Sequence, residues 1–165
     1  MIDKRLIPQQ YVESVQDIDY EALKEQGVKG LIFDIDNTLV PHGADSTAEV
    51  DKFCEGLKKK GFRLLLLSNN NEARILRFKK NIECQYICDA NKPLPDNYLR
   101  AADMMGVTKE EVVVIGDQIF TDIKGANDAG MRNILVKYIG HEKREWKGFR
   151  RYLEWMLLKL FFHNQ

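Results

Sequence analysis

Two aspartates stand two positions apart directly after an apolar run, which makes them candidates for chemistry. Asp34 and Asp36 follow residues 31–33, which are leucine, isoleucine and phenylalanine. On an extended segment, residues two apart point to the same side. Two carboxylates there repel each other unless a cation or a shared proton intervenes. The pair therefore predicts a site for a cation or for proton transfer, and the alternative is a surface turn with a helix cap.

Further polar residues follow other apolar runs along the chain. Each of them alone fits a simpler role, because serine and aspartate are common in turns and helix caps and a loop lysine is usually solvated. Their order after successive apolar runs indicates instead that they meet at one place in the fold. These residues are Ser68, Asn69, Lys92, Asp117 and Asp122.

The apolar runs alternate with segments of helical spacing. Runs that are apolar at consecutive positions indicate strands buried on both faces, and helices between them indicate parallel crossovers. We therefore expect an α/β fold with a doubly wound parallel sheet, whose ligand site lies beyond the carboxyl ends of the strands. The expected strands are 30–35, 62–67, 85–88, 112–115 and 133–136, and the expected helices are 47–60, 72–80, 95–105 and 121–129.

Length and charge narrow the class of protein. The chain has 165 residues with 25 basic and 25 acidic side chains, which suits a single domain over 1–165 with a leader at 1–28 and gives no general attraction to nucleic acid. Its three cysteines are an odd number in a chain too long to depend on disulfides, and the first residues lack the apolar run of a signal peptide. We expect a reduced, cytoplasmic protein without a nucleic-acid partner.

These residues, in this order, resemble the motifs of haloacid dehalogenase (HAD) phosphatases. The matching motifs are Asp34-x-Asp36-x-Thr38, Ser68, Lys92 and Gly116-Asp117-x-x-x-x-Asp122. The first and last are specific, whereas a lone serine or lysine is not. Residues 36–39, 92–95 and the leader at 6–18 more narrowly resemble the YqeG family of HAD subfamily IIIA, which is related to mitochondrial phosphatidylglycerophosphate phosphatases. The resemblance runs from about Leu6 to Gly140.

The resemblance implies a Mg²⁺-dependent hydrolase of phosphate monoesters. Asp34 is then the nucleophile that forms an aspartyl-phosphate, and Asp36 is the general acid and base. Asp34, the backbone carbonyl of Asp36 and Asp117 are the implied ligands of Mg²⁺, which prefers hard oxygen atoms.

The same resemblance assigns the groups that hold the phosphate. Ser68, the backbone N–H of Asn69 and Lys92 contact the phosphoryl oxygens, and Lys92 neutralises developing charge. Asp122 supports these groups from behind without contacting the phosphate. The hydroxyl of Thr38 fixes the loop in which Thr38 lies.

The spacing of the motifs leaves no room for a cap domain. Residues 39–61 can hold a loop and one helix, and residues 71–92 can hold one helix and one strand. We therefore expect an open active site. In the HAD superfamily, such a site implies a large substrate, a headgroup presented at a surface, or a neighbouring subunit that covers the site.

The segment 142–162 is predicted to be an amphipathic helix with two alternative roles. One apolar face favours packing on the sheet or a homo-oligomer contact. Apolar residues beside that face, with several basic residues, favour peripheral contact with an anionic membrane, at its inner face for a cytoplasmic protein. The face comprises Trp146, Phe149, Leu153, Met156, Leu157 and Leu160, and the residues beside it are Trp155, Leu158, Phe161 and Phe162.

Phosphatidylglycerophosphate is the best single substrate prediction, because of the family relation and the amphipathic tail. A soluble sugar or nucleotide phosphate is the first alternative. A catalytically silent, HAD-derived binding module is the second, and the complete set of Asp34, Asp36, Lys92 and Asp117 argues against it.

Overall fold

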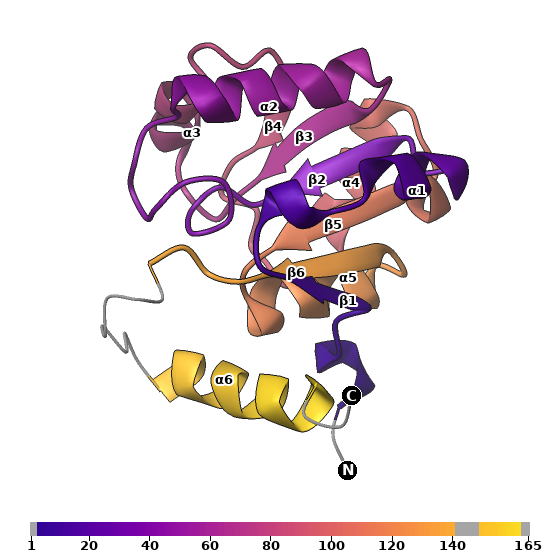
Figure 1. Ribbon diagram of the computed structural model, residues 1–165, viewed down its shortest axis with the longest axis vertical. Helices are drawn as coiled ribbons and strands as arrows, with labels where there is room; N and C mark the ends of the chain where they lie inside the picture. Colours follow the sequence, from indigo (N-terminus) through magenta and orange to yellow (C-terminus); the bar gives the residue numbers. More distant parts are fainter. Residues whose placement is uncertain (1–2, 141–148, 163–165) are drawn as a thin grey trace.

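The computed structural model describes residues 3–140 and 149–162, and its centre is a parallel β-sheet (Figure 1). The strands lie in the order β1-β6-β5-β2-β3-β4, and every neighbouring pair is parallel. The α/β parallel sheet expected from the sequence is confirmed. The bounds are β1 Gln10–Val12, β2 Gly30–Phe33, β3 Arg63–Leu67, β4 Gln85–Ile87, β5 Val112–Gly116 and β6 Arg132–Val136.

Helices cover both faces of this sheet. They are α1 (Tyr20–Glu25), α2 (Ala48–Lys59), α3 (Glu72–Phe78), α4 (Asp96–Met105) and α5 (Lys124–Asp128). The first three lie on one face, and α4 and α5 lie on the other (Figure 1). Alternate residues of β2 divide between the two layers, because Leu31 and Phe33 pack with the first group and Ile32 packs with the second. This double coverage explains why the strands are apolar at consecutive positions.

Local sequence signals set the helix bounds. The Thr47 hydroxyl accepts a hydrogen bond from the Val50 N–H at the start of α2, and the Asn71 side chain does the same for Arg74 at the start of α3. Gly106, with φ of 64°, ends α4 in the left-handed conformation that glycine adopts without steric cost. The observed bounds of α2 and α4 lie within one residue of the expected ones.

The N-terminal leader is part of the fold. β1 pairs with β6 at the edge of the sheet, with Tyr11 opposite Leu135, and α1 places Tyr20 and Leu23 in the core. β1 has three residues, too few for an alternating pattern to indicate a strand. The leader therefore covers the edge of β6, which the sequence pattern did not reveal.

The segment after β5 departs from the helix expected at 121–129. It begins with a π-helical turn, η4 (Ile119–Ile123), and continues as α5. Gly125 lies so close to Tyr98 of α4 that an added Cβ would come within 2.4 Å of the ring. The Tyr98 hydroxyl also donates a hydrogen bond to the Thr121 carbonyl at 2.9 Å. Contact with α4 therefore fixes the segment that follows Asp117.

The last described helix, α6 (Phe149–Phe162), lies beyond β1 at the edge of the sheet (Figure 1). Leu157 and Leu158 pack against η4 and β6, and the ring of Phe162 lies 5.5 Å from that of Tyr11. Residues 142–148 of the expected helix lie outside the described residues. Among the described residues, every helix falls short of the length and apolarity that crossing a bilayer requires.

The face that α6 turns toward the domain differs from the one that apolar spacing predicts. Phe149, Met156 and Leu160 are expected on the packed face, but their side chains are exposed. Leu157 of the predicted face packs on the domain, but so do Leu158 and Phe162, which lie off that face. The prediction was wrong for the exposed residues because α6 is apolar nearly all round, so polar contacts and not apolar spacing set its orientation.

The connections after the central strands are short. Residues 34–62 hold α2 and residues 68–84 hold α3, so neither connection contains an added domain. The chain runs from β2 outward to β3 and β4, then crosses back to β5 on the other side of β2. The strand order therefore reverses between β2 and β5. In open α/β sheets, ligands bind beyond the carboxyl ends of the strands at this point.

Gly125→Ala should destabilise the fold because the new methyl group overlaps the Tyr98 ring. We expect the free energy of unfolding, measured by urea denaturation, to fall by about 1–3 kcal/mol. The control Gly56→Ala in α2 adds a methyl group with no neighbour within 4 Å, and it should raise stability by about 0.5–1 kcal/mol. Equal stability of the two variants would contradict the close packing of α4 and α5.

Candidate active site

Asp34 and Asp117 are adjacent because their strands are adjacent. Asp34 directly follows β2 and Asp117 directly follows β5. The two strands pair in parallel, with Phe33 opposite Ile115. Both aspartates are buried. The structure thus brings two of the predicted site residues together at the reversal of strand order.

Lys92 reaches the same place from the loop after β4. Its Nζ donates hydrogen bonds to Asp34 Oδ1 at 2.7 Å and to Asp122 Oδ1 at 2.6 Å, and 5% of its side chain is exposed. Burial alone lowers the pKa of Lys92, but the Asp122 and Asp34 carboxylates outweigh it and hold the pKa above its ordinary value. Burial raises the pKa of Asp34 to about 6, although Lys92 opposes the shift.

Asn69 holds the backbone of Lys92. Its side-chain oxygen accepts a hydrogen bond from the Lys92 N–H at 2.8 Å, and its Nδ2 donates to the Lys92 carbonyl at 3.4 Å. The loop after β3 is thereby tied to the loop after β4. Next to this contact is a cavity of about 430 Å³ lined by Asn69, Asp89, Asn91, Lys92 and Leu94.

Asp34, Asp117 and Asp122 form a cluster of buried carboxylates. One oxygen of each lies within 4.8 Å of the others, close enough for one cation to contact all three. Gly116 permits this approach, because an added Cβ would lie 2.3 Å from Cγ of Asp122. Carboxylate oxygens are hard ligands of the kind that Mg²⁺ and similar divalent cations prefer. The residues present therefore fit a divalent metal ion.

This cluster differs in part from the predicted metal ligands. Asp34 and Asp117 belong to both sets. Asp122, expected as an anchor behind the ligands, offers a carboxylate to the cluster and also accepts a hydrogen bond from the Gln118 N–H at 3.1 Å. The Asp36 side chain lies outside the cluster. Its predicted contribution is a backbone carbonyl, and that remains a prediction.

Both carboxylate oxygens of Asp117 accept hydrogen bonds. Thr38 donates to Oδ1 at 3.2 Å, and Arg151 of α6 donates to Oδ2 at 2.5 Å. Burial raises the pKa of Asp117 to about 8, although Arg151 opposes the shift. The sequence predicts that Thr38 fixes its own loop. In the structure, its hydroxyl joins this loop to the one that carries Asp117.

The carboxylate of Asp36 lies among a separate group of donors. Its Oδ1 accepts hydrogen bonds from the Gly43 N–H at 2.8 Å and from Arg74 at 2.9 Å, and its Oδ2 accepts one from Asn70 at 2.6 Å. Burial raises the pKa of Asp36, but these donors outweigh it and hold the pKa below its ordinary value. The buried Ser68 hydroxyl joins the group by accepting hydrogen bonds from the Asn70 N–H and Nδ2.

Three side chains of the site, Asn70, Arg74 and Arg151, were not predicted from the sequence. Asn70 stands next to the predicted Asn69, so the run of asparagines after a buried strand is a signal that could have found it. Arg74 is one of two arginines in α3, and an arginine in a helix usually indicates solvent exposure. Arg151 is 34 positions from Asp117, a separation at which no local pattern predicts a contact.

Comparison with known proteins places the chain in a family. Residues 44–130 match the sequence profile of haloacid dehalogenase-like hydrolases. The chain is also 36% identical over 159 residues to the probable phosphatase YqeG of Bacillus subtilis, a match that covers 96% of this chain and 92% of that protein. The chain belongs to the haloacid dehalogenase-like hydrolases. The resemblance drawn from its motifs is confirmed, and the protein is a phosphatase of this family.

Two further matches are a more distant relative and a solved structure. The chain is 26% identical over 166 residues to phosphatidylglycerophosphate phosphatase 1 of Arabidopsis thaliana, and it spans 93% of its own length but only 47% of that relative. Among solved structures, the cobalt-bound deoxy-D-mannose-octulosonate 8-phosphate phosphatase of Haemophilus influenzae superposes with a TM-score of 0.55 at 16% identity, covering 82% of this chain and 87% of that chain. Because the identity is only 16%, this similarity shows a shared fold and nothing about the reaction.

The buried acids should make stabilisation by Mg²⁺ depend on pH. The pKa values of Asp34 and Asp117, about 6 and about 8, lie above the ordinary value for aspartate. Folded protein therefore binds these protons more tightly than unfolded protein. The free energy of unfolding of the metal-free protein falls as the pH rises toward 8. Mg²⁺ binds the ionised carboxylates and offsets this loss.

We expect Mg²⁺ to raise the thermal unfolding midpoint above its value in EDTA, by about 5–10 °C at 100 times its Kd. With the same Mg²⁺ concentration at both pH values, the rise should be larger at pH 8 than at pH 6, because more of both carboxylates is ionised at the higher pH. Asp117→Asn should reduce it, whereas the control Asp103→Asn, exposed on α4, should not. A rise that is equal at both pH values, or larger at pH 6, would argue against these acids as cation ligands.

Proposed function

We propose that the protein hydrolyses phosphate monoesters with Mg²⁺ through an aspartyl-phosphate on Asp34. The observation that carries this proposal is the place of Asp34, buried where the strand order reverses, 2.7 Å from the Lys92 ammonium and within a carboxylate cluster that fits a divalent cation. Phosphoryl transfer needs a nucleophile in line, neutralisation of phosphate charge and a proton for the leaving oxygen. We assign Asp34 as the nucleophile, Lys92 as the neutralising group and Asp36 as the proton donor.

The proposed reaction has two steps. In the first, a carboxylate oxygen of Asp34 bonds to phosphorus while the bond from phosphorus to the ester oxygen breaks, and the leaving oxygen takes that electron pair and a proton from Asp36. In the second, water attacks phosphorus, Asp36 takes a proton from the water, and the bond from phosphorus to Asp34 breaks. When bound, Mg²⁺ supplies further neutralisation of the phosphoryl charge.

The environment of Asp36 supports its role as a base. Hydrogen bonds from Gly43, Arg74 and Asn70 hold its pKa below the ordinary value. A lowered pKa favours the carboxylate, which is the form that Asp36 has after the first step and in which it accepts a proton from water in the second. These contacts therefore support the base role more directly than the acid role.

Lys92 and the residues after β3 are proposed to hold the phosphoryl group. Lys92 is a buried cation beside Asp34 and neutralises charge that develops on the phosphoryl oxygens. The Ser68 hydroxyl accepts hydrogen bonds from Asn70, and its own hydrogen is the donor that we assign to a phosphoryl oxygen. The Asn69 backbone N–H is the second assigned donor, and the Asn69 side chain keeps this loop against Lys92.

We infer that the substrate is a phosphorylated lipid headgroup, and phosphatidylglycerophosphate is the specific proposal. The Arabidopsis relative supports it by its name, and the short connections after β2 and β3 leave the site open to a large substrate. The outer face of α6 adds exposed apolar side chains with basic ones beside them, a combination suited to an anionic lipid surface. This outer face comprises Phe149, Arg150, Tyr152, Met156, Lys159 and Leu160.

A soluble sugar phosphate is the second candidate. The cavity beside Lys92 favours it, because three of its lining residues, Asn69, Asp89 and Asn91, present polar side chains that can bind hydroxyl groups. Turnover of phosphatidylglycerophosphate in mixed micelles, compared with a panel of soluble monoesters, distinguishes the two candidates.

Asp34→Asn keeps the shape of the nucleophile but removes its charge. We expect kcat on a phosphate monoester to fall by about 10³–10⁶-fold with little change in the unfolding midpoint. Asp103→Asn, which makes the same chemical change at an exposed position of α4, should retain wild-type turnover. A folded Asp34→Asn protein with near wild-type turnover would refute the proposed mechanism.

The outer face of α6 should bind anionic vesicles if the substrate is a lipid. We expect the intact protein to sediment with phosphatidylglycerol vesicles, less so at high salt, and the double variant Met156→Glu, Leu160→Glu to lose this binding. The matched variant Leu76→Glu, Leu99→Glu places the same charges at exposed positions of α3 and α4 and should still bind. Absence of vesicle binding by the intact protein would remove this support for a lipid substrate.

A further inference from the structure

Polar contacts attach α6 to the loop that carries Asp117. Glu154 is 6% exposed, and its Oε1 accepts hydrogen bonds from the backbone N–H groups of Ile119 at 3.0 Å and Phe120 at 3.4 Å. These N–H groups lie at the start of η4, where a helix provides no acceptor of its own. Glu154 thus fixes which face of α6 meets the domain.

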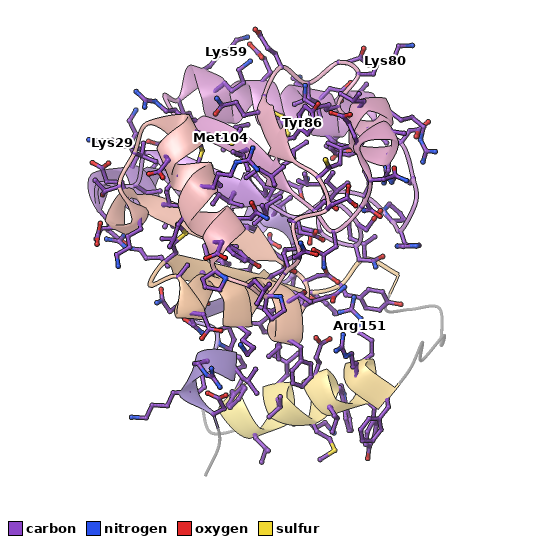
Figure 2. All side chains as sticks on the ribbon, turned by 180° about the vertical axis from the view of Figure 1, so that it is seen from behind. Lys29, Lys59, Lys80, Tyr86, Met104 and Arg151 are labelled. Atoms are coloured by element: carbon purple, nitrogen blue, oxygen red, sulfur yellow. The ribbon has the colours of Figure 1, made fainter. Side chains whose placement is uncertain are left out.

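Arg151 extends from the same face of α6 toward the domain (Figure 2). Its Nη1 donates to the Asp117 carbonyl at 3.0 Å and to Glu154 Oε2 at 3.1 Å, and its Nη2 donates to Asp117 Oδ2 at 2.5 Å. The guanidinium also lies over the ring of Tyr138, with Cζ 4.8 Å from the ring centroid. Arg151 therefore holds the backbone and the side chain of Asp117 at the same time.

We propose that Arg151 is a positioning residue of the cation site, which holds the Asp117 carboxylate in the orientation that a divalent cation requires. The inference rests on the proposed function, because Asp117 is proposed as a cation ligand there. It makes α6 a part of the active site, although this helix lies outside the sheet.

The contacts on Asp117 support this role. Arg151 holds Oδ2 and the backbone carbonyl, and Thr38 holds Oδ1. Each carboxylate oxygen has two lone pairs, so both oxygens keep one for a cation. Mutation of a group that orients a metal-binding side chain in this way typically lowers the affinity for the metal by about 10–100-fold. A lysine cannot reproduce the contact fully, because an ammonium lacks the planar fork of a guanidinium.

The charge of Arg151 has the opposite effect on a cation. A guanidinium beside Asp117 repels a divalent cation. If repulsion were the only effect, Arg151 would compete with the cation for the Asp117 carboxylate and lower the affinity for the cation. Glu154 reduces this repulsion, because its buried carboxylate lies 3.1 Å from the guanidinium. Orientation and repulsion therefore predict opposite changes in cation affinity when Arg151 is removed, and we expect orientation to dominate.

Calorimetric titration of the EDTA-treated full chain with Mg²⁺ tests the inference without using activity. We expect Arg151→Met to raise the Kd for Mg²⁺ by about 10–100-fold and Arg151→Lys to give an intermediate value. The control Arg150→Met removes the same charge from an exposed position of α6 and should leave the Kd unchanged. Turnover of a soluble monoester by Arg151→Met should recover as Mg²⁺ approaches saturation.

Hydrogen exchange of the α6 backbone separates positioning from docking. Glu154→Gln weakens the attachment of α6 to the domain but leaves Arg151 in place. The inference is supported if, at equal protection of α6 from exchange, Arg151→Met loses more Mg²⁺ affinity than Glu154→Gln does. It is overturned if Arg151→Met binds Mg²⁺ as tightly as wild type or more tightly. It is also overturned if both variants lose affinity only in proportion to lost protection. A wild-type chain that binds no Mg²⁺ overturns the cation site of the proposed function as well.

Discussion

A positive charge buried between carboxylates is the interaction on which the site depends. The Lys92 ammonium lies within hydrogen-bonding distance of both Asp34 and Asp122, and all three side chains are nearly excluded from water. Removing one member of a buried ion pair leaves an uncompensated charge, which typically costs about 3–5 kcal/mol. These residues come from three different segments, after β2, after β4 and in η4. The sheet and the helices packed on it bring these three segments together.

The sheet places Asp34 and Asp117 side by side, and contacts with helices fix the segments that carry Asp117 and Asp122. Parallel pairing of β2 and β5 places Asp34 beside Asp117, and Gly116 lets Asp122 approach the end of β5. Contact between Tyr98 and Gly125 then fixes the turn that carries Asp122. From the other side, α6 holds Asp117 through Arg151. The same helix carries the exposed apolar face that is proposed to contact lipid, so α6 contributes to both proposals.

The sequence predicts that the acids lie together at the strand ends, because short apolar runs between helical segments indicate buried strands and parallel strands end at one edge. The place of Asp34, Lys92 and Asp117 in the fold was therefore predictable, whereas their roles remain predictions. Contacts between remote side chains were not, since no periodicity relates Arg151 to a residue 34 positions away. The orientation of α6 was missed for a related reason. A single buried acid, Glu154, decides it, whereas hydrophobic spacing in a helix that is apolar nearly all round favours no unique face.

The aspartyl-phosphate on Asp34 is the central claim, and it can be observed directly. Wild-type protein turning over a phosphate monoester with Mg²⁺ is quenched in acid, digested and examined by peptide mass spectrometry, with release of inorganic phosphate measured in the same sample. We expect one phosphoryl group on Asp34, present with substrate and Mg²⁺ and absent when EDTA is added before substrate. A phosphoryl group on a different residue during confirmed turnover would contradict the account.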